Sequence, residues 1–525
     1  MQIYLLRTEG AGVLYGVKPT PNGARYEWSV TNTSPAPLRI RSVRLVFDMH
    51  RFVGAPRVFR NGYQSWSPSD VAVFGTDRDP SWKADAPFFQ SAHHADGRTV
   101  TNEYELRSEW VTVIGDDSDQ KLLVGFIGSG NHDGTLRLTH GVEGDTELVV
   151  EAFLGDVELA PGASRQLDPV VLEMGSDADV LLALWADQVA NVARARNTAP
   201  FQVGWCSWYH YFDNVTEHDL RANLAHAAPY PFEVFQLDDG YQAAIGDWLE
   251  TNGKFPSGLA AIGQAIAAAG YRPGIWLAPF LVAPDSTVAR EHPDWIAEFR
   301  AGRPLKAWVN AVWGGAMYAL DTTNPEVLAH LEGVAAALRE MGFTYLKLDF
   351  TFAPSFDGMW RDPSRTPAQR VRAGFDAIRR GAGDDAFILG CGVPLAHVVG
   401  VVDANRIGPD VAPLWEPAPE TEVFPGYLRT QPGTKFAQDA TNRRAFMHRR
   451  LWLNDPDCLM LRTTETRLTP EQVQEWARTV GESGGMVLVS DDLALLDDGA
   501  QALLAEVVAA GRRADAALTR PDASK

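Results

Sequence analysis

Cysteine is scarce in this sequence. Only three cysteines, Cys206, Cys391 and Cys458, occur among the 525 residues, and they lie far apart. An odd number of widely spaced cysteines excludes a disulfide framework and is typical of a protein that works in a reducing compartment. We therefore expect a cytoplasmic protein.

Long apolar runs and leader-like segments are missing as well. No stretch approaches the about 18 apolar residues that a membrane-spanning helix needs. The first nine residues, Met-Gln-Ile-Tyr-Leu-Leu-Arg-Thr-Glu, contain no long apolar core after a basic start, as an export signal would. We expect neither export nor a membrane partner.

Basic residues are outnumbered by acidic ones. The chain has 47 Lys and Arg against 67 Asp and Glu, which gives a net charge of −20. An acidic excess repels phosphate backbones and anionic lipids, so nucleic acid is not an expected partner. A small neutral substrate suits this charge better, and the sequence leaves a homo-oligomer open.

Patterns that bind metals or phosphates are also absent. The twelve histidines include no His-x-His and no His-Glu-x-x-His, so we expect neither a catalytic metal nor another cofactor. The stretch Gly481-Glu482-Ser483-Gly484-Gly485 matches the serine-hydrolase elbow only as text. A predicted helix precedes it and a predicted strand follows it, which is the reverse of the order in that elbow.

The sequence does contain a clear change of texture near residue 176. Residues 1–175 are rich in strands whose apolar and polar residues alternate, as in 38–49. This pattern predicts an N-terminal β-sandwich. Residues 176–200 predict a linker helix, because apolar residues recur there at helical spacing.

Residues 201–490 repeat a strand, a loop and a helix. The expected strands are Val203–Trp208, Val234–Leu237, Pro273–Leu277, Tyr345–Leu348, Phe387–Leu389, Asp403–Ile407, Cys458–Leu461 and Met486–Val489. A capping residue before proline marks three helix starts, Asn324-Pro325, Thr366-Pro367 and Thr469-Pro470. Eight such units predict a (β/α)₈ TIM barrel, with Met317–Leu320 as an extra strand in an insertion. Residues 491–525 predict a helix and a polar tail.

Acidic residues follow several of the expected barrel strands. Asp238 and Asp239 come after the second strand, Asp349 after the fourth and Asp410 after the sixth. Each alone is most often an ordinary turn or cap residue. The carboxyl ends of all barrel strands meet at one rim, where the functional groups of this fold lie. Their convergence there, with Lys347, Cys391 and Arg406, predicts chemistry by paired carboxylates.

Aromatic residues lie close to the same loops. The chain has 16 tryptophans, and although most of them are expected in the core, Trp66, Trp208 and Trp276 lie beside loop residues. Sugar rings pack their C–H faces on aromatic rings while their hydroxyls bind carboxylates and cations. This combination predicts a carbohydrate substrate.

At these residues the chain resembles the α-galactosidases of glycoside hydrolase family 36. The resemblance rests on Asn61-Gly62-Tyr63-Gln64-Ser65-Trp66, Gly204-Trp205-Cys206-Ser207-Trp208-Tyr209, Gln236-Leu237-Asp238-Asp239-Gly240-Tyr241, Gly274-Ile275-Trp276, Lys347-Leu348-Asp349, Cys391-Gly392, and Arg406 with Asp410. It implies an N-terminal β-sandwich, a catalytic (β/α)₈ barrel and a C-terminal β domain. Residues 491–525 leave little room for that last domain, so we expect it to be short or missing.

The resemblance also implies a role for each site residue. Asp349 would be the nucleophile and Asp410 the general acid/base of a retaining hydrolysis of terminal α-linked galactose. The substrate-binding residues would be Asp238 and Asp239 on the 4- and 6-hydroxyls, Lys347 on the 3- and 4-hydroxyls, Arg406 with Cys391 and Gly392 near the 2-hydroxyl, and Trp66, Trp208, Tyr209 and Trp276 as apolar walls. We further expect Lys347 to keep Asp349 ionised, and Arg406 to be directed at the substrate rather than at Asp410.

Other activities stay open. An α-N-acetylgalactosaminidase or a galactosyl-transferring enzyme of the same family would carry the same acids. Cys391, rather than a smaller residue, beside the 2-position favours unsubstituted galactose. A non-catalytic sugar-binding barrel is disfavoured, because both Asp349 and Asp410 are present.

Overall fold

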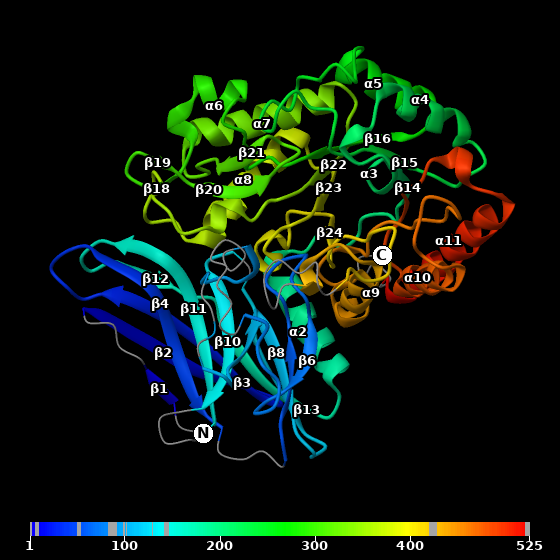
Figure 1. Cartoon of the computed structure of the whole chain (residues 1–525). Helices are drawn as coiled ribbons and strands as arrows, with labels where there is room; N and C mark the ends of the chain where they lie inside the picture. The colour runs from blue at the N-terminus through cyan, green and yellow to red at the C-terminus, as the bar shows by residue number, and fades with distance from the viewer. Residues whose placement is uncertain are drawn as a thin grey trace, which may run out of the picture.

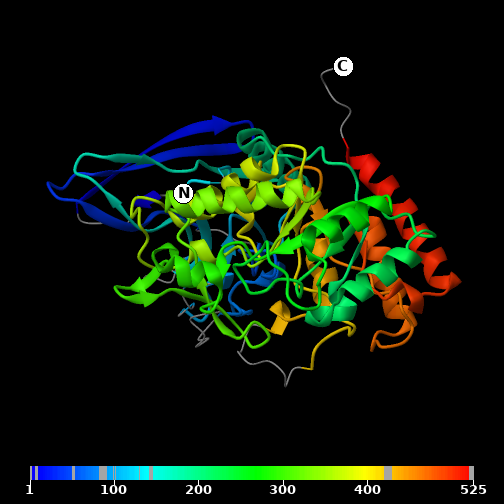
Figure 2. The same cartoon turned by 90° about the horizontal axis from the view of Figure 1, so that it is seen from above.

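The structure, a computed structural model, describes residues 3–5, 10–49, 54–81, 92–97, 100, 102–128, 130–140, 146–418 and 428–519. The N-terminal strands lie below a larger part built from strands and helices (Figure 1). Seen from above, those strands and the C-terminal helix lie at opposite edges of the molecule (Figure 2).

The first thirteen strands of the described chain form two antiparallel sheets. One sheet has the order β1 (Ile3–Leu5), β4 (Leu38–Asp48), β11 (Thr146–Leu159), β10 (Asp133–His140) and β7 (Leu106–Glu109). The other has the order β12 (Ser164–Gln166), β3 (Gly23–Asn32), β13 (Val170–Gly175), β9 (Lys121–Phe126), β8 (Val111–Gly115), β5 (Arg57–Arg60) and β6 (Asp70–Val73), with β2 (Ala11–Thr20) paired to β3.

Alternating residues of these strands are buried. On β3 the side chains of Tyr26, Trp28 and Val30 are buried, and the residues between them are partly exposed. Tyr26 of one sheet contacts Phe47 of the other edge-to-face, with ring centroids 5.3 Å apart. This contact favours a β-sandwich, and the sandwich over residues 1–175 stays a prediction.

Helix α2 (Ala178–Ala193) connects the sheets to the barrel. Its N-cap is Asp177, whose carboxylate accepts hydrogen bonds from the amides of Asp179 and Val180. Trp185 on its buried face donates a 3.0 Å hydrogen bond to the carbonyl of Phe126 on β9. The domain boundaries at 1–175, 176–200, 201–490 and 491–525 remain a proposal, and residues 520–525 of the expected tail lie outside the described residues.

Eight parallel strands form a nearly closed barrel, as predicted. In chain order they are β14 (Val203–Cys206), β15 (Val234–Leu237), β16 (Arg272–Leu277), β22 (Tyr345–Leu348), β23 (Phe387–Gly390), β24 (Ala404–Arg406), β25 (Leu453–Asp455) and β26 (Val487–Val489). β26 pairs with β14, and a parallel bridge between Leu459 and Val489 joins the chain after β25 to β26. The strands are short and almost wholly buried, which explains their continuous apolar runs.

Helices surround the barrel (Figure 1). The α-helices are α3 (Trp208–Tyr211), α4 (Glu217–His226), α5 (Gly258–Ala268), α6 (Thr287–Glu291), α7 (Pro325–Glu340), α8 (Pro367–Ala382), α9 (Thr434–Arg443), α10 (Pro470–Ser483) and α11 (Asp498–Leu518). Short 3₁₀ helices are η1 (Phe212–Asn214), η2 (Pro293–Trp295), η3 (Ala353–Ser355), η4 (Leu395–Val398), η6 (Leu428–Thr430), η7 (Ala445–Met447) and η8 (Leu493–Leu495). No helix among the described residues combines the length and apolar character that crossing a bilayer requires.

An insertion between β16 and β22 carries extra strands, as expected. β17 (Leu281–Val282), β21 (Gly315–Ala319) and β20 (Lys306–Asn310) form one small sheet, and β18 (Glu298–Arg300) pairs with β19 (Arg303–Pro304). After β26, the described chain up to Thr519 contains only η8 and α11.

The predicted position of the seventh barrel strand is wrong. We expected it at Cys458–Leu461, but β25 spans Leu453–Asp455. Pro456 cannot donate a ladder hydrogen bond, and Asp457 has a φ of +91°, so the strand ends before Cys458.

Candidate active site

The predicted acids lie at one rim of the barrel. Asp238 and Asp239 follow β15, Asp349 follows β22 and Asp410 lies four residues after the end of β24. All barrel strands run parallel, so these positions share the carboxyl end of the barrel. In the strand order β15 and β24 are four places apart, which puts Asp239 and Asp410 on opposite sides of the rim.

Asp349 is held by two hydrogen bonds. Trp276 Nε1 donates to Asp349 Oδ2 at 3.0 Å, and the amide of Phe350 donates to Oδ1 at 2.8 Å. Phe350 has a φ of +51°, which is unusual for a non-glycine residue. The carboxylate is 7% exposed, so its orientation is fixed before any ligand arrives.

Asp238 forms a buried ion pair with Lys347. Lys347 Nζ lies 2.9 Å from Asp238 Oδ2, and both side chains are at most 5% exposed. Burial, the largest single effect, lowers the pKa of Lys347, but nearby negative charges, led by Asp238, together raise that pKa well above its usual value. Asp349 also favours the charged lysine. The hydrogen bond and the ion pair of Lys347 both go to Asp238 rather than to Asp349.

Asp239 has two side-chain donors of its own. Gln242 Nε2 donates to Oδ1 at 2.7 Å and Trp313 Nε1 donates to Oδ2 at 2.8 Å. Burial raises the pKa of this carboxyl to about 6, although the two donors act in the opposite direction. Asp239 thus changes its charge closer to neutral pH than an ordinary aspartate.

Arg406 is surrounded by three carboxylates. Its Nε donates to Asp455 Oδ2 at 3.0 Å, and its Nη1 donates to Asp457 Oδ2 at 2.7 Å and to Asp410 Oδ1 at 3.0 Å. Tyr209 also donates its hydroxyl to Asp457. The expectation that Arg406 avoids Asp410 is wrong, because Asp455 and Asp457 fix the guanidinium in a position that reaches it.

The pKa of Asp410 is nevertheless raised, to about 7. Its side chain is 32% exposed, but most of its surroundings are protein, and this burial favours the neutral form. Arg406 opposes the shift, whereas the negative charges of Asp457 and Asp349 add to it. Asp410 therefore carries a proton at a pH where an ordinary aspartate has lost it.

The remaining predicted residues lie around these acids. Trp276 is 1% exposed and contacts Asp349, while Tyr209 is 2% exposed with its hydroxyl on Asp457. Trp208 is half-buried and packs edge-to-face against Phe212, with centroids 5.4 Å apart. Cys391 is fully buried, and burial together with Asp349 raises the pKa of its thiol.

Trp66 reaches this group from the β5–β6 loop of the N-terminal sheets. Its ring lies edge-on to Phe350, with centroids 4.9 Å apart. Gly392, with a φ of +53°, lies beneath it, and a Cβ there would come within 2.9 Å of the ring. A side chain at position 392 would displace Trp66, which accounts for the glycine.

Sequence reasoning missed three residues of this group: Asp455, Asp457 and Trp313. The two acids follow the apolar Leu451-Trp452-Leu453, which is the same signal that revealed Asp349. Because we expected the seventh strand at Cys458–Leu461, we did not recognise this run as a strand followed by acids. Trp313 lies in the loop between β20 and β21 of the insertion. No local sequence pattern indicates that this loop reaches Asp239. No three metal-binding side chains of the described residues are arranged to hold an ion, and a metal-free reaction stays a prediction.

Comparisons with known proteins show what the chain is similar to. Residues 186–353 match the family model named Melibiase. The solved α-galactosidase TtGalA of Thermus thermophilus, in complex with stachyose, is 27% identical at a TM-score of 0.75, covering 97% of this chain and 99% of that one. Its complex with p-nitrophenyl α-D-galactopyranoside gives 28% identity and a TM-score of 0.73, covering 99% and 95%. The predicted family resemblance is confirmed.

Curated relatives match over shorter stretches. The α-galactosidase AgaA of Geobacillus stearothermophilus is 23% identical over 285 residues, and the match spans 51% of this chain and 38% of that relative. The α-galactosidase of Escherichia coli is 34% identical over 93 residues, or 16% of this chain and 13% of that protein. The prediction of a glycoside hydrolase is confirmed as well.

The melibiase match covers only part of the site. Asp238, Asp239, Lys347 and Asp349 lie within residues 186–353, whereas Arg406 and Asp410 lie beyond them. The assignment of Asp410 thus depends on the geometry around Arg406 rather than on the melibiase match.

Proposed function

We propose that this protein is a retaining α-galactosidase that removes terminal α-linked galactose from oligosaccharides by double displacement. The observation that carries the proposal is the contrast between two carboxylates at one rim. Asp349 is oriented by two hydrogen-bond donors, whereas Asp410 has a pKa raised to about 7. A nucleophile needs the first environment and a general acid the second.

In the first step Asp349 attacks the anomeric carbon from the β face. Asp410 gives its proton to the glycosidic oxygen, the C1–O bond breaks and a β-linked galactosyl ester forms on Asp349. The hydrogen bonds from Trp276 and the Phe350 amide hold the attacking carboxylate in place. This positioning lowers the entropic cost of the step.

In the second step a water molecule attacks C1 from the α face. Asp410, now ionised, takes a proton from that water, and the ester bond to Asp349 breaks to release α-galactose. A double displacement of this kind requires the two carboxyl groups to lie about 5 to 5.5 Å apart. Asp349 and Asp410 follow β22 and β24, which are two places apart in the strand order, and this supports their proximity at the rim.

Recognition of galactose would use the opposite side of the rim. The carboxylates of Asp238 and Asp239 would accept hydrogen bonds from the 4- and 6-hydroxyls, and Lys347 would donate to the 3- and 4-hydroxyls. An equatorial 4-hydroxyl, as in glucose, would leave a buried carboxylate unmatched, which is costly. The buried Cys391 beside the 2-position favours galactose over its 2-acetamido derivative.

The substrate class follows from charge and from similarity. The net charge of −20 suits a small neutral oligosaccharide, and the similar Thermus thermophilus enzyme has been solved with stachyose and with p-nitrophenyl α-D-galactopyranoside. All three cysteines are free and buried, which supports a cytoplasmic location.

Proton NMR of the first-formed sugar tests the proposal. With p-nitrophenyl α-galactoside we expect α-galactose to appear first and to mutarotate slowly to the β anomer. α-N-acetylgalactosaminide and β-arabinopyranoside serve as comparison substrates, and the first should be hydrolysed much more slowly. Initial β-galactose, or loss of activity with a chelator, would contradict the mechanism.

A further inference from the structure

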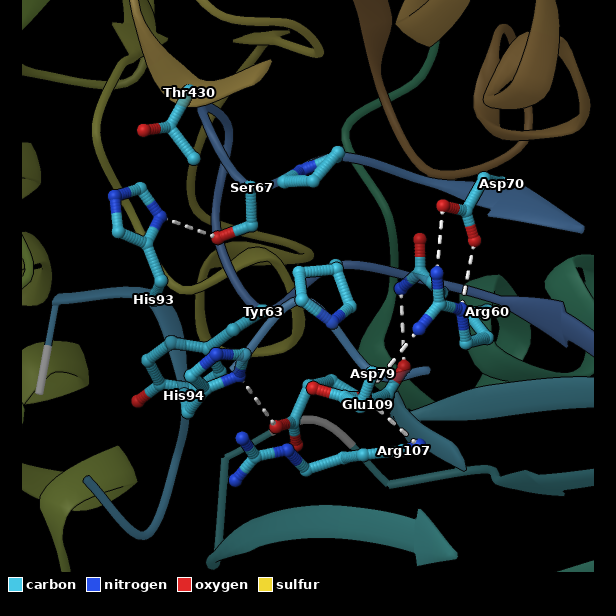
Figure 3. Close-up of a pocket in the computed structure, with 14 residues that line it drawn as sticks. Arg60, Tyr63, Ser67, Asp70, Asp79, His93, His94, Arg107, Glu109 and Thr430 are labelled. Carbon is cyan, nitrogen blue, oxygen red and sulfur yellow. Dashed lines mark hydrogen bonds and ion pairs between the residues drawn. The ribbon is translucent and has the colours of Figure 1, made fainter. Parts of the chain in front are cut away.

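The loop that carries Trp66 extends from the N-terminal sheets to the barrel. We call residues 61–69, which connect β5 to β6, the Trp66 arm. At its base the amide of Asn61 donates to Ser108 Oγ at 2.8 Å, and the side chain of Asn61 donates to the carbonyl of Glu109 at 3.1 Å, both on β7. Figure 3 shows this side of the arm, with Ser67 pointing toward His93, 2.9 Å from its Nδ1. The sheets therefore hold the arm from one side.

The loop after β23 contacts the arm from the other side. The amide of Leu395 donates to the carbonyl of Tyr63 at 3.1 Å, and Gln64 forms an antiparallel bridge with Pro394. Gly392 of the same loop lies under the Trp66 ring. The position of Trp66 beside Phe350, the residue after Asp349, thus depends on how the arm docks on the barrel.

Arg444, between α9 and η7, binds four backbone carbonyl groups of the arm. Its guanidinium donates to the carbonyls of Gly62, Gln64, Ser65 and Ser67 at 3.2, 3.4, 2.9 and 2.8 Å, and to Asn61 Oδ1 at 3.4 Å. Its sixth acceptor is the carbonyl of Ile407, at 2.7 Å, directly after Arg406. One side chain therefore joins the arm to the end of β24.

This arrangement is unusual for a buried cation. Arg444 is 0% exposed, and its hydrogen bonds within the described residues go to carbonyl oxygens and one side-chain amide. A buried guanidinium without a carboxylate partner is costly, since its charge is compensated only by dipoles. Five N–H groups in a planar fork can serve these diverging acceptors, whereas the three of a lysine cannot.

We propose that Arg444 is a positioning residue for the galactosidase reaction, because it fixes the Trp66 arm against the strand end that carries Arg406. Arg444 acts through Trp66 and touches neither the substrate nor the reacting atoms. The inference rests on the proposed function, in which Trp66 forms one wall of the galactose pocket. Loss of Arg444 would then weaken substrate binding by the amount that Trp66 contributes, and no more.

A double-mutant cycle tests this coupling. We would measure kcat and KM for p-nitrophenyl α-galactoside and raffinose with the parent, Trp66→Ala, Arg444→Lys and the double variant. We expect Arg444→Lys to lower kcat/KM about tenfold, mainly through KM. Adding it to Trp66→Ala should change kcat/KM by less than about twofold, because the wall that it positions is already gone.

Arg379→Lys is the matched control. Arg379 is also buried, but it binds the carbonyls of Ala386 and Val401 and the carboxylate of Asp403 at the other end of the barrel. We expect this variant to lower the melting temperature as Arg444→Lys does. Its kcat/KM should stay near that of the parent, and its effects should be additive with those of Trp66→Ala.

Several results would overturn the proposal. Additive losses of kcat/KM for Arg444→Lys and Trp66→Ala would show that Arg444 only stabilises the fold. An unchanged KM in Trp66→Ala would show that Trp66 does not contribute to substrate binding, so Arg444 could not act through it. If Arg444→Lys does not fold, Asn61→Ala, which removes one acceptor, must show a smaller loss that also disappears in the Trp66→Ala background. A parent without activity on α-galactosides would refute the proposed function itself, whereas additivity in an active parent refutes only the role of Arg444.

Discussion

At the scale of single residues, Asp349 and Asp410 differ in what surrounds them. Two donors orient Asp349, whereas Asp410 shares the Arg406 guanidinium with Asp455 and Asp457. Arg406 is itself 1% exposed. The same rim thus provides one carboxylate held by two donors and one whose pKa lies near neutral pH.

Azide rescue distinguishes the two roles. Asp349→Gly should be inactive on all substrates, since no covalent intermediate forms. Azide in that variant would attack from the β face and give β-galactosyl azide from an activated α-galactoside. Asp410→Ala should retain activity on dinitrophenyl galactoside, whose leaving group needs no proton, and azide should then give the α product. Exchanged anomers in the product NMR spectra would mean that the two assignments are reversed.

The pH profile of kcat/KM should reflect two of the shifted groups in the free enzyme. Activity should rise as Asp239 ionises near pH 6 and fall, about tenfold per pH unit, as Asp410 loses its proton above about pH 7. Asp457→Asn removes a negative charge that raises the pKa of Asp410, so the alkaline limb should move to lower pH. Asp403→Asn, which removes a buried acid far from the rim, should leave that limb in place. An unchanged limb in Asp457→Asn would contradict the role of this network.

At the scale of elements, the carboxyl end of β15 carries two neighbouring acids with opposite effects on stability. Asp238 neutralises the buried Lys347, so Asp238→Ala should destabilise the fold by about 3 to 5 kcal/mol. Asp239 has a folded pKa of about 6, above its unfolded value. Protonated Asp239 therefore adds to the free energy of unfolding at low pH, and this contribution is lost as the pH rises through about 6.

Calorimetry at two pH values checks this difference. At about pH 8, Asp239→Asn should melt at a higher temperature than the parent and Asp238→Ala at a lower one. The gain from Asp239→Asn should disappear below about pH 4, where the unfolded chain is also protonated. Both variants should lose most of their activity. Equal melting temperatures for the two would contradict the ion pair and the burial described here.

Local sequence signals predicted some elements better than others. The starts of α7, α8 and α10 were predictable, because Asn324, Thr366 and Thr469 each cap a helix that begins with proline. The position of β25 was not predictable, because this strand includes Asn454 and Asp455, polar residues that are typical of a loop. Their partners, Arg406 and Trp452, satisfy them only in the folded barrel.

At the scale of the whole molecule, the chain pattern indicated the barrel and which strand ends carry acids. It did not indicate which acids share a cation, since Asp455 and Asp457 reach Arg406 only because β24 and β25 pair in the folded barrel. It also gave no sign of Arg444, since all of its partners except Ile407 lie 377 to 383 residues earlier in the chain. Contacts of this range leave no periodic trace in a sequence, which is why sequence reasoning found the reacting groups more readily than the residues that hold them.

The contact between Gly62 and Arg444, separated by 382 residues, also bears on how the protein is made. On the ribosome, the Trp66 arm emerges long before the residue that binds it, and domains made first generally fold first. The arm therefore lacks its Arg444 contacts until the chain has been synthesised past α9. A nascent chain released before that point would contain Asp349 and Asp410 but lack the arginine that joins the Trp66 arm to the end of β24.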